Sequence, residues 1–315
     1  IGIDMSGKIT AIIASTLLFI NVIFWCSILF VLTPIKLILP NIVVRKLLDP
    51  FFSAIAGAWI SCNSGWMKLT QNTRWNVELP KTLDPKGWYF VSSNHQSWVD
   101  IFVLQHVLNG KIPFLKFFLK QELIRVPIMG QAWWALDFPF MKRFSKSYLE
   151  KHPEMKGKDV ETTQQACEKF KHMPTSVMNF LEGTRLTPSK HEKQNSPYRH
   201  LLNPKSGGFA FALNAMGDKF QSLLDCTIVY PNGIPSFVEF MQGKVPEVVV
   251  KIREVPIPVE FCQGDYENDA EFKKRFQSWI SDIWLEKDQE IEDIKRGYQR
   301  STETESDNEN SARLA

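Results

Sequence analysis

The sequence GWYFVSSNHQSWVD, residues 87–100, spans a change from a strand to a helix that sets the fold expected for this chain. Residues 87–93 are aromatic and β-branched, as in a buried strand, whereas the apolar residues after Trp98 recur at helical spacing. On one continuous helix, the side chains of His95 and Asp100 would point about 140° apart. At a strand–loop–helix corner, a carboxylate in the first helical turn can instead reach a histidine at the strand end.

Two interpretations of this corner follow from the residues. In one, His95 is a catalytic base and Asp100 is the carboxylate that orients it. In the other, Ser97 and Asp100 form a helix N-cap pair, similar to a capping box with Asp in place of Glu. Within these residues alone, both interpretations stand.

The composition predicts a folded protein from a reducing compartment. Of 315 residues, 44% are apolar and 12% aromatic, which is ample for a hydrophobic core and excludes disorder for most of the chain. The formal net charge of +3 is too small to indicate nucleic-acid binding, and the sequence has no zinc-finger spacing. Its five cysteines are scattered and form no Cys-x-x-Cys pair, so we expect neither a disulfide framework nor a metal site.

The N-terminal region predicts a membrane helix. Residues 9–33 contain no charged side chain, and 25 helical residues reach about 37 Å, more than the hydrocarbon core of about 30 Å. A cleaved signal peptide is the alternative, but the apolar run is too long and no cleavage pattern ends it before Pro34. Because Pro34 and Pro40 interrupt the next segment, the helix can either cross the membrane or return as a re-entrant hairpin.

Charge and hydropathy next to this helix predict its orientation and a second helix. Basic residues follow the helix in greater number than they precede it, which places the bulk of the chain in the cytoplasm. Residues 47–70 are apolar and aromatic, typical of an interfacial helix. We therefore expect a membrane segment at 1–46, and an interfacial helix with a linker at 47–74.

From about residue 75 the chain alternates between strand and helix patterns, which predicts an α/β domain over 75–297. The last residues, 298–315, lack apolar periodicity and predict a disordered polar tail. Besides 87–93, we expect strands at 75–79, 112–114, 138–141, 176–181, 224–230 and 247–255. We expect helices at 98–109, 115–123, 128–136, 159–172, 205–217 and 269–294.

A second chemically informative stretch is FLEGTR, residues 180–185. Gly183 permits a tight turn, and Arg185 presents a planar fork of donors suited to phosphate. A surface turn held by a salt bridge would explain the same residues without a ligand.

Four ordered blocks resemble the PlsC-like glycerolipid acyltransferases, the family of 1-acylglycerol-3-phosphate acyltransferases. NHQSWVD resembles the His-x4-Asp motif of that family, and FLKQELIRVPIMGQAWWALDFPFMKR resembles its second block, with Lys120 and Arg143 on matching positions. FLEGTR resembles the third block, and IVYPNG resembles the fourth, on Pro231. The resemblance covers about residues 10–297, and the segments ALDFPFMKR and GKDVETT are similar to the bacterial inner-membrane YihG type.

The resemblance implies a mixed sheet flanked by helices, and acyl transfer from acyl-CoA or acyl carrier protein to a lysophospholipid hydroxyl. Its usual acceptor is 1-acylglycerol-3-phosphate, with no cofactor or metal, at the cytoplasmic side of a bacterial inner membrane. His95 would be the general base and Asp100 its orienting carboxylate. The cations expected at the acceptor phosphate are Lys120, Arg143, Arg185 and Lys205. The other motif and pocket residues are Asn94, Glu182, Gly183, Thr184 and Pro231.

Departures from the family pattern leave the acceptor head group open. Leu181 stands where many members have proline, and Tyr230 precedes Pro231 where the usual fourth block is rich in valine. Lysophosphatidylglycerol is an example of another acceptor. A membrane-anchored hydrolase is a competing function, but the sequence has no Gly-x-Ser-x-Gly motif. A non-catalytic lipid-binding protein is a third function, against which the intact His95 and Asp100 argue.

Overall fold

The computed structural model describes residues 5–38, 42–141, 151–152, 161, 165–167 and 172–314. A six-stranded sheet with the strand order β1-β8-β7-β2-β6-β3 lies at the centre. Neighbouring strands in this sheet are parallel, except that β7 and β8 are antiparallel. The strands are β1 (Arg74–Glu78), β2 (Tyr89–Ser93), β3 (Leu115–Phe117), β6 (Ser176–Asn179), β7 (Ser222–Val229) and β8 (Glu247–Val255).

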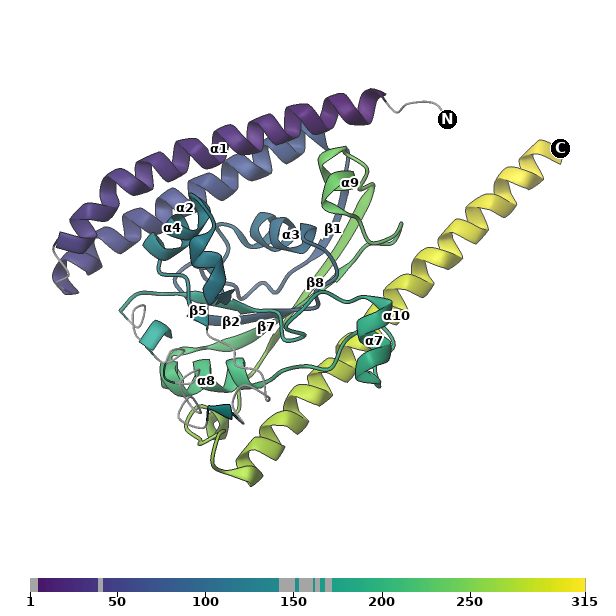
Figure 1. Cartoon of the computed structure of the whole chain (residues 1–315). Coiled ribbons are helices and arrows are strands. Elements are labelled where there is room, and N and C mark those ends of the chain that lie inside the picture. The colour runs from purple at the N-terminus through teal and green to yellow at the C-terminus, as the bar shows by residue number, and fades with distance from the viewer. Residues whose placement is uncertain are drawn as a thin grey trace.

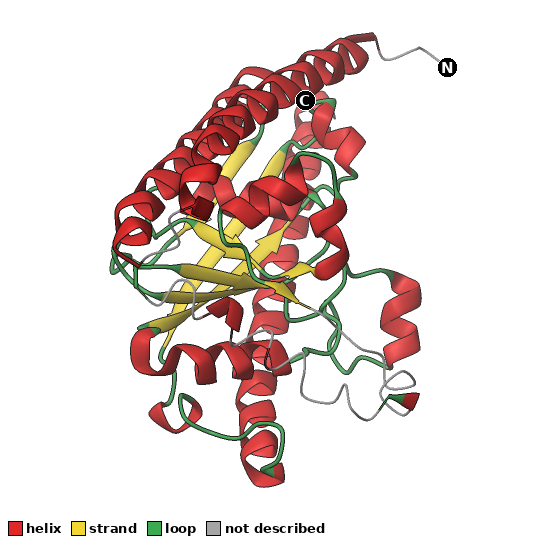
Figure 2. Ribbon diagram, turned by 60° about the vertical axis from the view of Figure 1, so that its left-hand side comes forward, coloured by secondary structure: helices red, strands yellow, loops and turns green. Residues whose placement is uncertain are grey.

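Helices cover both faces of the sheet (Figure 1), and Figure 2 shows the strands between the two helical layers. One layer contains α1 (Met5–Ile38), α2 (Ile42–Thr70), α3 (Val99–Leu108), α4 (Met129–Ala135) and α9 (Phe237–Met241). The other contains α8 (Gly207–Met216) and α10 (Ala270–Leu314). The short helix α7 (Pro188–Gln194) follows β6. The remaining elements are the strand pair β4 (Leu119–Lys120) and β5 (Phe140–Met141) and the 3-10 turns η1 (Gln121–Arg125), η3 (Gly217–Lys219) and η4 (Val259–Phe261).

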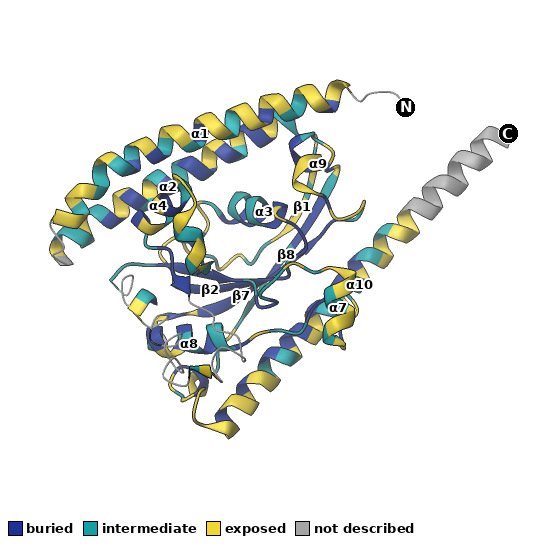
Figure 3. Cartoon of the chain, in the orientation of Figure 1, coloured by how far each residue is buried: buried dark blue, intermediate teal, exposed yellow. Residues whose placement is uncertain are grey.

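The period of two along the central strands divides the core between these layers. On β2, Phe90 stacks on Phe209 of α8 at 3.7 Å between ring centroids, whereas its neighbour Val91 packs on the opposite side. Figure 3 shows the outer face of α1 exposed, and the strands β2, β6 and β7 are buried throughout, whereas the edge strand β1 is mostly exposed. The central strands are therefore hydrophobic on both faces, as expected for a mostly parallel sheet between helices.

The N-terminal helices α1 and α2 pack against each other as an antiparallel pair above the sheet (Figure 1). The buried Asn21 amide of α1 donates to Asn63 Oδ1 of α2 at 2.8 Å and to the Trp59 carbonyl at 3.2 Å. Within the described residues, α1 is the one helix with the length and apolar composition needed to cross a membrane. The apolar surface of α1 therefore indicates membrane association. The junction of the two helices, with Pro40, lies outside the described residues.

The predicted α/β class with a mixed sheet and an N-terminal apolar helix is confirmed. At the C-terminus, α10 begins one residue after its predicted start but remains helical to Leu314, through most of the predicted disordered tail. Extending an existing helix costs far less than starting one, which is why a segment without apolar periodicity can continue α10. The helix predicted at 159–172 falls mainly outside the described residues.

The prediction of a strand at 112–114 followed by a helix at 115–123 is wrong. Residues 115–117 form β3 at the edge of the sheet, paired in parallel with β6, and residues 119–120 form β4, paired with β5. The segment LKFFLK carries apolar residues that fit either period. Pairing with the distant strand β6 therefore decides its conformation, which local spacing does not encode.

Candidate active site

His95 lies just beyond the carboxyl end of β2, the strand between β7 and β6. Because both neighbours run parallel to β2, the loops that follow all three strands meet at this edge of the sheet. Asn94 fixes the loop start, since its side-chain amide donates to the Ile228 carbonyl and accepts from the Ile228 N–H, each at 2.8 Å. The fully buried Asn94 thus extends the hydrogen-bonded ladder from β2 to β7.

The structure brings His95 and Asp100 into contact, with 2.9 Å between Nδ1 and Oδ2. Asp100 is fully buried, and its Oδ2 also accepts from the backbone N–H groups of Gln96 at 2.7 Å and Ser97 at 2.9 Å. The second oxygen, Oδ1, accepts from the Tyr230 hydroxyl at 2.6 Å. An ionised carboxylate only accepts hydrogen bonds, so the proton of a neutral His95 ring lies on Nδ1 and leaves Nε2 free as a base.

The N-cap interpretation describes only part of this arrangement. The N-cap residue of α3 is Trp98, without a side-chain cap bond, and the Ser97 hydroxyl donates to the Pro235 carbonyl at 2.6 Å. Asp100 nevertheless accepts the Ser97 N–H, as the acid of a capping box does. The same carboxylate therefore holds the loop backbone and the histidine ring.

The Glu182 side chain links the FLEGTR turn to the backbone of His95. This fully buried carboxylate accepts the His95 N–H through Oε1 at 2.7 Å and the Leu202 N–H through Oε2 at 2.9 Å. Burial raises the pKa of Glu182 to about 7, although the two backbone donors favour its charged form. The Trp284 indole of α10 donates to the Leu202 carbonyl at 3.0 Å, so α10 supports this brace from the opposite face.

The turn itself supplies the residues next to the imidazole. Gly183 has a φ of 68°, in the left-handed region that glycine tolerates. Phe180 stacks on the His95 ring, with 3.9 Å between centroids and 15° between planes. The Arg185 guanidinium lies 5.0 Å from the ring centroid of the half-exposed Trp98, a cation–π distance.

A cavity of about 360 Å³ opens beside His95. Its lining is mainly apolar and comes from α3 and the residue before it, the segment from β3 to η1, the segment from α4 to β5, and the end of β6 with the loop that follows: Trp98, Ile101, Gln105, Phe117, Phe118, Leu119, Leu123, Trp133, Phe138, Met141, Asn179 and Phe180. The rest of its lining is His95, Lys120, Gly183, Thr184 and Arg185. The imidazole thus faces a space that is apolar along most of its wall and cationic in part.

The predicted phosphate cations do not all meet at this cavity. Lys120 and Arg185 line it, whereas Lys205 does not, and the Lys205 backbone N–H donates to the Leu181 carbonyl at 2.6 Å. Arg143 lies outside the described residues. Pro231 does not line the cavity either and belongs to the turn that follows β7.

Two polar residues at the site were not predicted from the sequence, namely Tyr230 and Lys190. The Lys190 ammonium donates to Thr184 Oγ1 at 2.7 Å and to the Arg185 carbonyl at 3.1 Å, which fixes the turn. Its signal in the sequence is weak: Thr187 caps α7 by accepting the Lys190 N–H, and Thr-Pro at a helix start is common. For Tyr230, the signal is its place before Pro231 at the end of an apolar strand.

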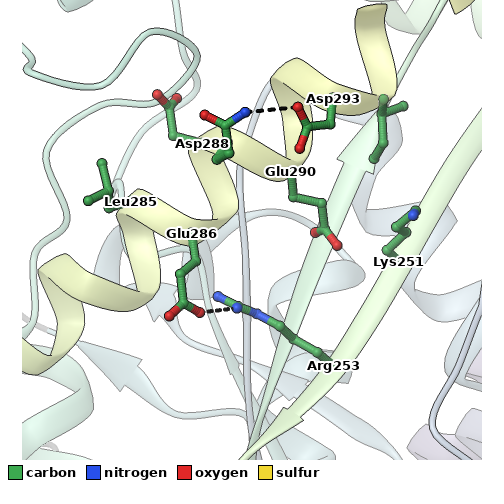
Figure 4. A pocket seen from close by; sticks show the side chains of 9 residues that line it. Lys251, Arg253, Leu285, Glu286, Asp288, Glu290 and Asp293 are labelled. Atoms are coloured by element: carbon green, nitrogen blue, oxygen red, sulfur yellow. Dashed lines mark hydrogen bonds and ion pairs between the residues drawn. The ribbon is translucent and has the colours of Figure 1, made fainter. Parts of the chain in front are cut away.

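A larger hollow, about 880 Å³, lies elsewhere, between β8 and α10 (Figure 4). Its lining comes from these two elements alone, with none of the loops at the carboxyl edge of the parallel strands. The Arg253 guanidinium is paired with the Glu286 carboxylate there, and Gln289 donates to Asp293 at 2.8 Å. We therefore place the candidate active site in the smaller cavity beside His95.

Residues 74–233 match the family described as Acyltransferase, and the chain belongs to that family. It is 24% identical over 248 residues to the 2-acyl-1-lysophosphatidylinositol acyltransferase of Saccharomyces cerevisiae, covering 62% of this chain and 58% of that protein. It is 26% identical over 222 residues to the mouse 1-acyl-sn-glycerol-3-phosphate acyltransferase gamma, covering 61% and 54%. The chain spans about half the length of the curated relatives it matches.

A solved structure shares the fold. The crystal structure of the 1-acyl-sn-glycerophosphate acyltransferase PlsC from Thermotoga maritima superposes with a TM-score of 0.52 at 15% sequence identity. The likeness covers 94% of this chain and 96% of that one, so the N-terminal helices and α10 are largely included. At this identity the likeness concerns the fold alone.

Proposed function

We propose that this protein transfers a fatty acyl group from a thioester to the free glycerol hydroxyl of a lysophospholipid. The observation that carries the proposal is the His95–Asp100 pair at the wall of an apolar cavity that also contains Arg185 and Lys120. Aromatic and aliphatic side chains suit an acyl chain, and two cations suit a phosphate. Family membership supports the reaction class.

In the proposed mechanism, His95 Nε2 removes the proton of the acceptor hydroxyl as its oxygen attacks the thioester carbonyl. The tetrahedral intermediate then expels the thiolate, which takes the proton back from His95. Asp100 stabilises the imidazolium that exists between these two transfers, as the acid of a Ser-His-Asp triad does. The substrate hydroxyl takes the place of the serine, so the enzyme needs no nucleophile of its own.

Stabilisation of the oxyanion requires N–H donors that are not already committed. The N–H groups of Gln96 and Ser97 donate to Asp100, and that of His95 donates to Glu182. The Gly183 N–H donates to the Phe180 carbonyl. We therefore assign this task to the segment of Thr184 and Arg185 rather than to the loop after β2.

We propose 1-acylglycerol-3-phosphate as the acceptor, which gives phosphatidic acid, with acyl-CoA or acyl carrier protein as the donor. Both cations of the cavity are then used on one terminal phosphate. The apolar surface of α1 supports a membrane location, which we propose to be the cytoplasmic side of a bacterial inner membrane. Lipid substrates would then reach the cavity from the bilayer.

The test uses the full chain in detergent or in phospholipid vesicles, with both donors and a panel of acceptors. The panel contains 1-acylglycerol-3-phosphate, lysophosphatidylglycerol, lysophosphatidylinositol and monoacylglycerol. We expect the phosphate-bearing acceptors to be used and monoacylglycerol to be poor. Release of free fatty acid without acyl transfer would indicate a hydrolase, and binding without turnover would indicate a lipid-binding protein. Equal use of monoacylglycerol would remove the role given to Arg185 and Lys120.

A further inference from the structure

The two oxygens of Asp100 are held unequally. Oδ2 accepts three hydrogen bonds, from the His95 ring and two backbone N–H groups, whereas Oδ1 accepts the Tyr230 hydroxyl. The bond from Tyr230 joins residues 130 positions apart, across the end of the sheet from β7 to α3. Removal of this hydroxyl would leave a fully buried carboxylate oxygen without that donor, and such a group is costly to leave unpaired.

The surroundings of Tyr230 fix both its direction and its protonation. Ile228 and Tyr230 belong to the same side of the core, as the period of two along β7 requires, and this side also contains Val99 of α3. The residue before a proline is restricted to extended conformations, so Pro231 keeps Tyr230 in line with the strand. Burial and the charge of Asp100 raise the pKa of Tyr230 well above its usual range, so the phenol stays neutral and donates.

Tyr230 is 4% exposed and does not line the cavity beside His95. A direct contact with a lipid or a thioester in that cavity is therefore not its role. Its hydroxyl reaches the site through Asp100 alone among the hydrogen bonds described for it.

We propose that Tyr230 is a positioning residue for acyl transfer: its hydroxyl anchors Oδ1 of Asp100, so that Oδ2 stays directed at Nδ1 of His95. The inference rests on the proposed function, because it assumes that His95 acts as the base.

The first experiment compares Tyr230→Phe with Tyr89→Phe at saturating donor and acceptor. Tyr89 is a matched control because it is a buried tyrosine of the neighbouring strand β2, and its hydroxyl accepts the Asp84 N–H at 2.9 Å, away from His95. We expect Tyr230→Phe to lower kcat about tenfold, the effect of one hydrogen bond to a charged group. The KM of each substrate should change less than twofold. Tyr89→Phe should leave kcat within twofold, even if its melting temperature falls by as much as that of Tyr230→Phe.

The second experiment repeats Tyr230→Phe in an Asp100→Asn background. If the hydroxyl acts through the carboxylate, the two changes are coupled. Tyr230→Phe should then lower kcat less than twofold when Asp100 is already replaced by Asn. A tenfold loss in both backgrounds would mean that Tyr230 does not act through Asp100, and would overturn the inference. So would a Tyr230→Phe variant with the kcat of the unmutated protein.

These outcomes separate the inference from the proposed function. If the unmutated chain transfers no acyl group to any acceptor of the panel, the proposed function fails, and the inference fails with it. If the unmutated chain is active and Tyr230→Phe is equally active, the inference alone fails. A Tyr230→Phe variant that loses activity only because it unfolds would show a lower folded fraction by circular dichroism, with unchanged kcat per folded molecule. That result would also overturn the positioning role.

Discussion

Asp100 and Asp137 are both largely buried carboxylates, but they have different partners. Asp100 accepts from neutral donors, namely two backbone N–H groups and a phenol, and from the imidazole of His95. Asp137 instead forms ion pairs with basic side chains, Lys36 at 2.5 Å and Arg45 at 2.8 Å. We call its surroundings the hairpin cluster, which consists of Lys36, Arg45, Asp49, Lys116, Asp137 and His172.

The difference matches two different requirements. A carboxylate that assists a base must keep its charge for the imidazolium that forms during reaction, and neutral donors fix its position without cancelling that charge. In the hairpin cluster, burial alone would raise the pKa of Asp137, but the charges of Lys116, Lys36 and Arg45 lower it. These ion pairs join α1 and α2 to the segment after α4, and α4 and this segment provide Trp133 and Phe138 of the cavity wall. We therefore propose that Asp100 serves the reaction, whereas the hairpin cluster holds α1 and α2 to the segment after α4.

The largest effect should come from His95→Ala, which removes the proposed base. We expect kcat to fall about a thousandfold, within the range for general acid–base groups, with the melting temperature nearly unchanged. His106→Ala is the control, because His106 is a half-buried histidine of α3 whose Nδ1 lies 2.8 Å from Ser64 Oγ and not at the cavity. Initial rates of acyl transfer would measure both variants. If the rate of His95→Ala stayed within tenfold of the unmutated rate, His95 would not be the base, and the role proposed for Asp100 in the reaction would fail with it.

Asp100→Asn tests whether the charge of the carboxylate matters beyond its hydrogen bonds. The amide can accept through one side only and carries no charge for the imidazolium, so we expect kcat to fall about a hundredfold. Asp137→Asn is the matched substitution in the hairpin cluster. It should lower the melting temperature and leave kcat per folded molecule within about threefold, because Lys36 and Arg45 then share the Asp49 carboxylate alone. If the two variants exchanged these behaviours, the assignment of the clusters would be reversed.

Arg185→Ala removes a cation that touches neither cluster and tests the acceptor phosphate. We expect kcat/KM for 1-acylglycerol-3-phosphate to fall at least about tenfold, since a bond to a charged group contributes about 1.5 to 3 kcal/mol. Arg185→Lys should restore it only in part, because an ammonium lacks the planar fork. Lys205→Ala is the control, since Lys205 does not line the cavity. Equal losses in Arg185→Ala and Lys205→Ala would point to long-range electrostatics instead of a phosphate site.

How well a feature could be predicted from the sequence depends on how far apart along the chain its interacting residues lie. The span of β8 is the one predicted, 247–255, because its apolar side chains and the turns around it are local features. The contact of His95 with Asp100 follows from five residues of sequence. By contrast, the partners of Tyr230 and Asp137 lie 130 and about 100 residues away, so no spacing rule relates them.

The site residues predicted least well belong to residue types, such as lysine, that occur in several different environments. Lysine is common on surfaces, and a motif position does not say where its side chain points, so Lys205 was expected at a cavity that it does not line. Lys116 shows the converse. Its neighbours Leu115 and Phe117 are buried in β3, and the lysine is only 5% exposed between them. Its local sequence suggests a solvated face of a helix, and only the sheet pairing reveals the burial.

Lys116 gives the smallest effect, and it concerns stability alone. Burial lowers the pKa of Lys116 to about 8, against about 10.4 in an unfolded chain. Between these values the unfolded state binds more protons than the folded state, so stability rises with pH from about 8 to about 10.4 and is flat below that window. Besides His172, the cluster has three basic side chains, Lys36, Arg45 and Lys116, for the two carboxylates Asp49 and Asp137, so Lys116→Met leaves two of each. We expect Lys116→Met to remove about 1 to 3 kcal/mol of that rise in the free energy of unfolding, measured by urea titration at several pH values.

The exposed Lys111 provides the control, since Lys111→Met should keep the rise, and kcat at pH 7 should stay within twofold in both variants. If the free energy of unfolding of Lys116→Met rose with pH by the same amount, the pKa of Lys116 would not be lowered in the folded state. The carboxylates of the hairpin cluster would then offset the cost of burying its charge.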